Sequence, residues 1–162
     1  DGLFLAGCFG GQTLSELRTA LSVAETDLSG GLSPRVSPMA EIRELGAILQ
    51  RAGMALPVAD SLKIPTSYRD IFHLMQDLRA MGETNIMNAR ATGITARALF
   101  KRAQKIYATT YSDSVGRLTC TFELVFLSGW SPDASQPKPL RPGSVTKTLQ
   151  QALREAKASP SN

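Results

Sequence analysis

Four polar side chains at separate points of the sequence could contact a ligand. Glu16 and Arg18 follow directly on a glycine turn, Arg35 lies in a loop rich in serine and proline, and Asn85 lies in a short polar hinge. An arginine can hold a carboxylate through two parallel hydrogen bonds. Each of the four can also be a solvated surface group or a local cap, and the residues alone favour that structural interpretation. They assign no catalytic residue.

The usual reaction centres are absent from the sequence. His73 is the single histidine, and no acid or nucleophile is spaced to act with it. Cys8 and Cys120 each lie in an apolar run, which is typical of buried, reduced thiols in a cytosolic protein. No group of residues has metal-ligand spacing and no phosphate-binding glycine loop occurs, so no metal site is predicted.

A pair of glycines marks a place where a ligand could approach the backbone. Phe9, Gly10 and Gly11 close an apolar run of strand type. Ligands commonly bind at the carboxyl ends of the strands of an open α/β sheet. Termination of the strand explains the glycines better, since no dinucleotide-binding fingerprint opens the helix that follows.

The elements that must position these residues are predicted from the apolar pattern. It indicates strands at residues 3–9, 56–64 and 117–128, and Pro57 places the second at a sheet edge because proline lacks a ladder donor. The last strand is apolar on both faces, which is typical of a strand covered on both sides. Apolar residues three or four apart indicate helices. These helices begin near Thr13, near Ser37, near Ser67 and near Thr95, with a further turn-and-helix at residues 144–156.

Composition divides the sequence into a body and a tail. Residues 1–130 are predicted to form one domain, and residues 131–162 a proline-rich linker and tail that we expect to be partly disordered. The opening Asp1-Gly2 turn suggests that the sequence begins inside a domain. Most of the net charge of +4 falls in the tail, so we expect no basic face on the body and no nucleic-acid partner. No apolar run is long enough for a membrane span, so no membrane partner is expected.

Several segments resemble class I S-adenosylmethionine-dependent methyltransferases. The opening apolar run, the glycine turn and Thr13-Leu14-x-Glu16-Leu17-Arg18 resemble the fifth strand and next helix of that fold. Within it, the sequence is most similar to the complex I assembly factor group, its alphaproteobacterial relatives and the malonyl-acyl-carrier-protein O-methyltransferases of biotin synthesis. The segments that carry this narrower resemblance include Ser33-Pro34-x-x-Ser37-Pro38, Met81-Gly82-Glu83-x-Asn85, Gly129-Trp130 and Arg141-Pro142-Gly143-Ser144.

The resemblance implies an α/β fold, the C-terminal half of a Rossmann-like methyltransferase sheet. About three strands would be present, with the last one antiparallel between the other two, together with four to five helices. The half that holds S-adenosylmethionine would be missing, so the full-length protein would use the cofactor and this chain would bind none tightly. The positions carried over are Phe9, Gly10 and Gly11 at the border of the cofactor site, and Glu16, Arg18, Arg35 and Asn85 on the substrate side.

The resemblance therefore implies the substrate-side portion of an S-adenosylmethionine-dependent methyltransferase, inactive as this fragment alone. Its methyl acceptor would be a small molecule, an acyl-carrier or a protein. The alternatives are a protein arginine hydroxylase or respiratory complex assembly factor of the same fold, and a non-catalytic interaction domain. The protein would be cytoplasmic in a bacterium or lie in the mitochondrial matrix of a eukaryote. An exposed first strand also predicts a homo-oligomer, because an unpaired apolar edge tends to pair with another chain.

Overall fold

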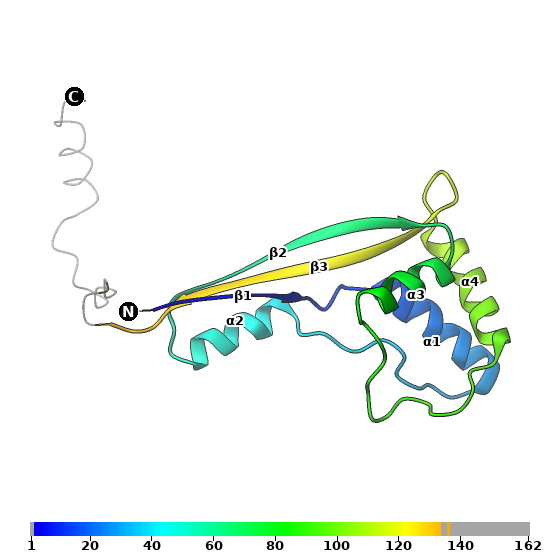
Figure 1. The fold of residues 1–162 in the computed structure, drawn as a ribbon, viewed down its shortest axis with the longest axis horizontal. Helices are drawn as coiled ribbons and strands as arrows, with labels where there is room; N and C mark the ends of the chain where they lie inside the picture. Colours follow the sequence, from blue (N-terminus) through cyan, green and yellow to red (C-terminus); the bar gives the residue numbers. More distant parts are fainter. Residues whose placement is uncertain (1, 134–135, 137–162) are drawn as a thin grey trace, which may run out of the picture. The chain divides into compact units, whose positions relative to one another are not determined.

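The computed structural model describes residues 2–133 and 136, and it divides the chain into two units, residues 1–131 and 132–162. The helix predicted at residues 144–156 lies outside the described residues. The first unit contains three strands and four helices in its described part, which confirms the predicted α/β fold class. The elements, shown in Figure 1, are β1 (Leu3–Phe9), α1 (Ser15–Ser29), α2 (Ile42–Arg51), β2 (Ala55–Tyr68), α3 (Ile71–Ala80), α4 (Arg97–Tyr111) and β3 (Leu118–Trp130).

The three strands form one sheet in the order β1-β3-β2. β3 pairs antiparallel with β1, where Trp130 lies opposite Leu3, and with β2, where Leu118 lies opposite Tyr68. Because β1 and β2 both run antiparallel to β3, they are parallel to each other. The last strand therefore lies between the other two, as the resemblance implies, and β2 is an edge strand, as Pro57 predicts.

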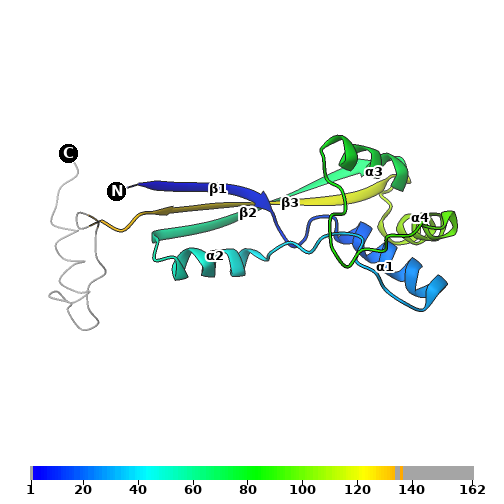
Figure 2. The ribbon, with the colours of Figure 1, turned by 60° about the horizontal axis from the view of Figure 1, so that its bottom comes forward.

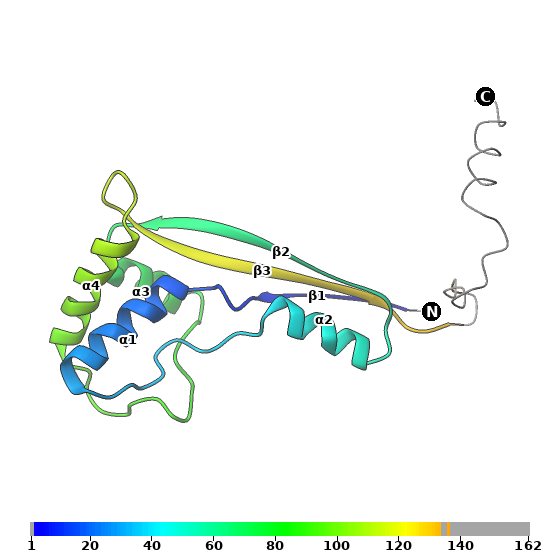
Figure 3. The same ribbon diagram turned by 180° about the vertical axis from the view of Figure 1, so that it is seen from behind.

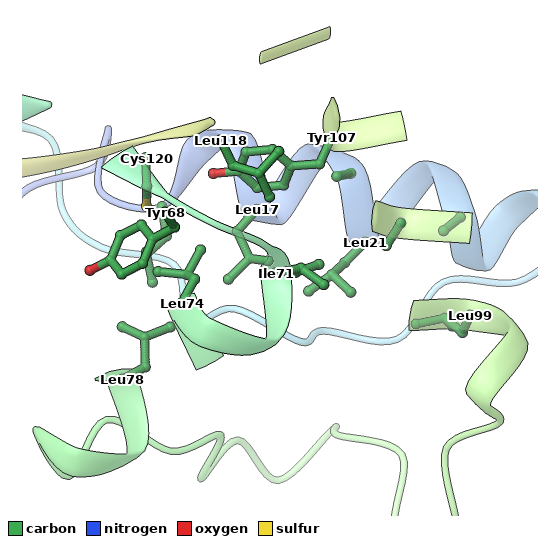
Figure 4. Packing of buried hydrophobic residues seen from close by; sticks show 14 residues of the cluster. Leu17, Leu21, Tyr68, Ile71, Leu74, Leu78, Leu99, Tyr107, Leu118 and Cys120 are labelled. Carbon is green, nitrogen blue, oxygen red and sulfur yellow. The ribbon is translucent and has the colours of Figure 1, made fainter. Parts of the chain in front are cut away.

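The larger core lies where α1, α3 and α4 pack against the paired ends of β2 and β3 (Figures 2 and 4). Tyr107 of α4 is fully buried, and its hydroxyl group donates a hydrogen bond of 2.8 Å to the backbone oxygen of Thr119 on β3. Burial raises the pKa of this hydroxyl group far above its usual range. The other large side chains of this core are Leu14, Leu17, Leu21, Tyr68, Ile71, Leu74, Leu78, Leu99 and Leu118.

A smaller core joins α2 to one face of the sheet. Leu49 of α2 packs with Val125 and Leu127 of β3, and all three are buried. On the opposite face of the sheet, Leu5 is 69% exposed and Phe126 is 50% exposed. The prediction that β3 is covered on both sides is thus wrong for its outer part within the described residues. Figure 3 shows α2 lying along the sheet, where it contacts β2 and β3.

The first helix begins later than the sequence predicts, and Thr13 is not its cap. α1 begins at Ser15, and its N-cap residue Leu14 has a φ of 57° and no side-chain cap. The hydroxyl group of Thr13 is instead bonded to both the backbone N–H and the backbone oxygen of Glu123. A contact to a distant strand has therefore replaced the local cap that Thr13 favours in isolation.

The second and third helices also begin later. α2 begins at Ile42 instead of near Ser37, because Glu41 and Glu44 form a reciprocal capping box at that point. α3 begins at Ile71 instead of near Ser67, since the β2–β3 pairing extends as far as Tyr68. The carboxylate of Asp70 then caps α3 by accepting a hydrogen bond of 2.8 Å from the backbone N–H of His73.

Only one of the two cysteines matches the predicted environment. Cys120 is buried, and burial raises the pKa of its thiol to about 12. Cys8 is exposed, although it lies opposite the buried Val125 in the register of β1 and β3. His73 is partly buried on α3 with its ring edge-on to Tyr68, as expected of a helix-surface histidine.

We predict that the chain self-associates through the free edge of β1. The edge that faces away from β3 has no partner strand in the described part, and it carries the exposed side chain of Leu5. Leu5→Lys should shift the chain towards monomer in sedimentation velocity, whereas Leu28→Lys, at an exposed position of α1, should not. A monodisperse monomer of the unchanged chain would contradict this prediction.

Candidate functional site

A pocket of about 330 Å³ lies beside α1 and α3. Its first lining residue in the sequence, Leu14, follows shortly after the carboxyl end of β1. Its walls come from three separate parts of the first unit: the start of α1, the loop before α2, and α3 with the segment that follows it. Phe100 of α4 completes it. The lining residues are Leu14, Leu17, Leu21, Arg35, Val36, Ser37, Met39, Met75, Leu78, Arg79, Glu83, Thr84, Asn85 and Phe100.

The lining combines apolar walls with a few polar groups, which is the usual composition of a small-molecule or side-chain site. Met39 and Met75 are flexible thioether side chains that adapt to ligands of irregular shape. Arg79 and Glu83 also line the pocket, and both side chains are exposed. Such a pocket fits a ligand with an apolar stem and a polar end.

Arg35 is the best-anchored polar group of the pocket. Its Nη2 atom lies 2.7 Å from Oε1 of Glu25 on α1, and its Nη1 atom donates to the hydroxyl group of Thr95 at 3.3 Å. Its Nε–H is buried and has no hydrogen-bond partner among the described residues. The arginine therefore holds the pocket wall to α1 and to the start of α4 while one donor remains unpaired.

Glu25 is held as a carboxylate by this arrangement. The residue is 7% exposed, and its carboxylate also accepts hydrogen bonds from the backbone and hydroxyl groups of Ser33. Burial alone would raise the pKa of Glu25. The hydrogen bonds from Arg35 and Ser33 and the charge of Arg35 outweigh burial and lower this pKa to about 2.

Asn85 lies in the same pocket wall as Arg35. Its Nδ2 atom donates to the backbone oxygen of Pro34 at 2.9 Å, and its Oδ1 atom accepts from the backbone N–H of Met87 at 3.1 Å. The structure thus brings Arg35 and Asn85 together from loops that are distant in sequence, and both line the pocket. A substrate contact by either residue stays a prediction.

Glu16 and Arg18 do not line the pocket. The carboxylate of Glu16 is buried and accepts hydrogen bonds from the backbone N–H and the hydroxyl group of Thr121 on β3. Arg18 donates to the backbone oxygens of Gly11, Thr13 and Ser37 at 3.2 to 3.4 Å. Both side chains hold α1 in place, and their contact with substrate also stays a prediction.

The glycine turn that follows Phe9 is packed against the protein's own carboxylates. A Cβ atom on Gly10 would lie 2.5 Å from Oε2 of Glu123, and one on Gly11 would overlap the carboxylate of Glu41. The same Glu123 oxygen accepts from the backbone N–H of Gln12 at 2.9 Å. These acids occupy the space that a side chain at either glycine would need. In the part of the chain that the structure describes, no group of acids, histidines or cysteines could hold a metal ion.

Several residues of this region are not predicted by any sequence pattern. Met39, Met75 and Arg79 line the pocket, but helix-spaced methionines and surface arginines carry no signal of their own. Glu123 is 4% exposed and contacts the glycine turn. The sequence could have indicated Glu123 by its position as the single acid inside the apolar run at residues 118–127.

We predict that the Glu25 pair stabilises the fold only above acidic pH. Because the folded pKa is lowered from 4.5 to about 2, its contribution is complete above pH 4.5 and is lost as the pH falls towards 2. At neutral pH, Glu25→Gln should lower the free energy of unfolding by about 2 to 3 kcal/mol in urea titrations. Between pH 4.5 and 2.5, the difference between the variant and the unchanged chain should shrink.

The matched control is Glu83→Gln, because Glu83 is an exposed acid of the same pocket. Glu83→Gln should change the free energy of unfolding by less than about 0.5 kcal/mol, both at neutral pH and at acidic pH. An equal loss in the two variants, or a difference for Glu25→Gln that does not depend on pH, would contradict the role of this pair.

Known proteins share this chain's sequence over most of its length. It is 40% identical over 148 residues to the mitochondrial arginine-hydroxylase NDUFAF5 of Dictyostelium discoideum, which covers 91% of the chain and 34% of that protein. It is 37% identical over 146 residues to the Homo sapiens protein of the same name, which covers 90% of the chain and 42% of the relative. It is 35% identical over 131 residues to the malonyl-[acyl-carrier protein] O-methyltransferase of Nitrosospira multiformis, which covers 81% of the chain and 40% of that enzyme.

The chain spans less than half the length of these relatives. No protein-family model matches it. In the described part, no helix is both long and apolar enough to cross a bilayer. The identities and the sheet order confirm the resemblance seen in the motifs: the chain is similar to a C-terminal part of class I methyltransferase-fold proteins, among them the NDUFAF5 arginine-hydroxylases and the malonyl-[acyl-carrier protein] O-methyltransferases.

Proposed function

We propose that this chain provides the substrate side of an enzyme of the methyltransferase fold, and that the complete protein uses S-adenosylmethionine. The pocket beside the start of α1 is the observation that carries this proposal. It lies next to the turn after β1, where ligands bind in open α/β sheets. The chain alone would then hold the acceptor and be inactive without the cofactor half of the fold.

The chemistry of the complete protein has two candidates. Relatives named arginine-hydroxylase are 35% to 40% identical to the chain, and those named malonyl-[acyl-carrier protein] O-methyltransferase are 31% to 35% identical. The higher identities favour hydroxylation of an arginine in a protein over methyl transfer. The apolar walls and the carboxylate of Glu83 would suit the stem and guanidinium group of an arginine, whereas Arg79 would suit a carboxylate such as that of a malonyl group.

The name of the arginine-hydroxylases places them in mitochondria. We accordingly propose the mitochondrial matrix for this protein if its source is eukaryotic and the cytoplasm if it is bacterial. The third possibility is a non-catalytic interaction domain, and it predicts no modified product at all.

Mass spectrometry of candidate acceptors separates these possibilities. The full-length protein would be incubated with S-adenosylmethionine and malonyl-acyl-carrier protein, or with arginine-containing proteins under oxygen and a reductant. The gain of a methyl group supports transfer, the gain of an oxygen atom supports hydroxylation, and the absence of both supports the interaction domain. Calorimetry should show no micromolar binding of S-adenosylmethionine to the 162-residue chain, and such binding would overturn the view that the cofactor site lies elsewhere.

We predict that filling the pocket mouth weakens substrate binding by the full-length protein. Thr84 lines the pocket and is exposed, so Thr84→Trp should block entry without disturbing the core. Its kcat/KM should fall about tenfold or more, chiefly through a higher KM. Thr110→Trp, at an exposed position at the end of α4 outside the lining, should stay within about twofold. Equal effects of the two variants would remove the pocket from the proposed function.

A further inference from the structure

We propose that the exposed basic segment from Arg79 to Lys101, referred to as the basic segment, docks an acidic protein surface at the pocket mouth. The segment includes the end of α3, the connection to α4 and the first turns of α4, and Figure 1 shows that connection as a long loop. This inference rests on the proposed function, because the docked partner would present its substrate group to the pocket.

The segment carries a local excess of positive charge that is not visible in the net charge of residues 1–130. Arg79, Arg90, Arg97 and Lys101 are all exposed, and Glu83 is the single acid between them. The body as a whole is nearly neutral because the acids that balance these charges lie elsewhere in residues 1–130. The nearly neutral body therefore conceals a local excess of exposed cations along this segment.

These cations are not used within the described structure. The side chains of Arg79, Arg97 and Lys101 form no ion pair or hydrogen bond with another described residue, whereas the side chain of the adjacent Arg102 is paired with Asp27 at 2.7 Å. Arg90 donates only to a backbone oxygen, that of Met87. Unpaired surface cations of one sign attract a complementary surface and speed its approach.

Exposed apolar side chains interrupt this positive charge. Ile86 is 79% exposed, and Ile94 is fully exposed. A mixture of apolar residues and arginines is typical of the surfaces that bind proteins. A surface for single-stranded nucleic acid would instead offer aromatic platforms, and the one aromatic residue of the segment, Phe100, lines the pocket. The observations therefore favour an acidic protein over a nucleic acid.

Both ends of the segment are attached to the pocket. At its start, Arg79 and Glu83 form part of the lining, and Asn85 is bonded to Pro34. Near its end, Thr95 accepts a hydrogen bond from Arg35. A partner bound to the segment would consequently lie next to the pocket mouth, where a side chain or prosthetic group of the partner could enter.

The test measures binding to the 162-residue chain without any assay of activity. The probe is a fluorescent synthetic helix with glutamates on one face and leucines on the other, and its affinity is read from fluorescence anisotropy. Reversing three charges (Arg90→Glu, Arg97→Glu and Lys101→Glu) should weaken binding about tenfold or more. The double variant Ile86→Ser with Ile94→Ser should weaken it about threefold through lost apolar contact.

The matched control reverses three exposed cations on α2 and β2 (Arg43→Glu, Arg51→Glu and Lys63→Glu), which changes the net charge by the same amount. It should leave the affinity within about twofold. An equal loss in both triple variants, or tighter binding of duplex DNA than of the acidic helix, would overturn the proposal. If both triple variants lose affinity equally while Thr84→Trp still lowers kcat/KM more than Thr110→Trp does, only the docking surface is refuted. If the basic-segment variant alone loses affinity while Thr84→Trp and Thr110→Trp have equal effects, only the pocket is refuted.

Discussion

The attachment of residues 10–16 to residues 121–123 of β3 is the contact on which the rest of the first unit depends. The backbone N–H of Gly10 bonds the oxygen of Glu123, and that of Leu14 bonds the oxygen of Thr121, each at 2.8 Å. Thr13 and Glu16 add side-chain bonds to the same two residues of β3. The chain that leaves β1 thus stays fixed to the central strand until α1 has begun, and the position of α1 determines one wall of the pocket.

The attachment has a local conformational cost. Leu14 adopts a left-handed backbone conformation that is uncommon for a residue with a side chain. This conformation persists because it lets the N–H of Leu14 bond the oxygen of Thr121 while the leucine side chain is buried. The two glycines before it allow close packing: a Cβ on Gly10 would clash with the buried Glu123 and with Val125, whereas one on Gly11 would meet only the exposed side chain of Glu41. Glycines in this turn therefore serve close packing of the scaffold within the described residues.

The sequence predicts strand order and core better than it predicts helix starts and side-chain roles. The apolar pattern was sufficient for β3 and for the buried face of α1, because burial requires the same periodicity in any fold. Thr13 and Ser37 illustrate the limit: each is a good local cap, but a long-range bond to Glu123 or the capping box of Glu41 decides where the helix begins. Arg18 and Arg35 illustrate it for the site. Both are arginines near a loop, yet one is surrounded by backbone oxygens and the other faces a pocket, and no local pattern distinguishes these positions.

Shared sequence with two kinds of enzyme constrains the scaffold more than the chemistry. The chain is 40% identical to an arginine-hydroxylase and 35% identical to an O-methyltransferase over largely the same residues, so the common part must be compatible with both reactions. The bonds between the glycine turn and β3 are of this kind, because they join residues of the chain to one another and position α1. Under the proposed function, a difference in acceptor would instead arise in the pocket, where Arg35 keeps one donor without a partner among the described residues and Arg79 and Glu83 are exposed. An exposed cation or carboxylate there can change from one relative to another without loss of stability, since surface substitutions away from caps and cores cost little.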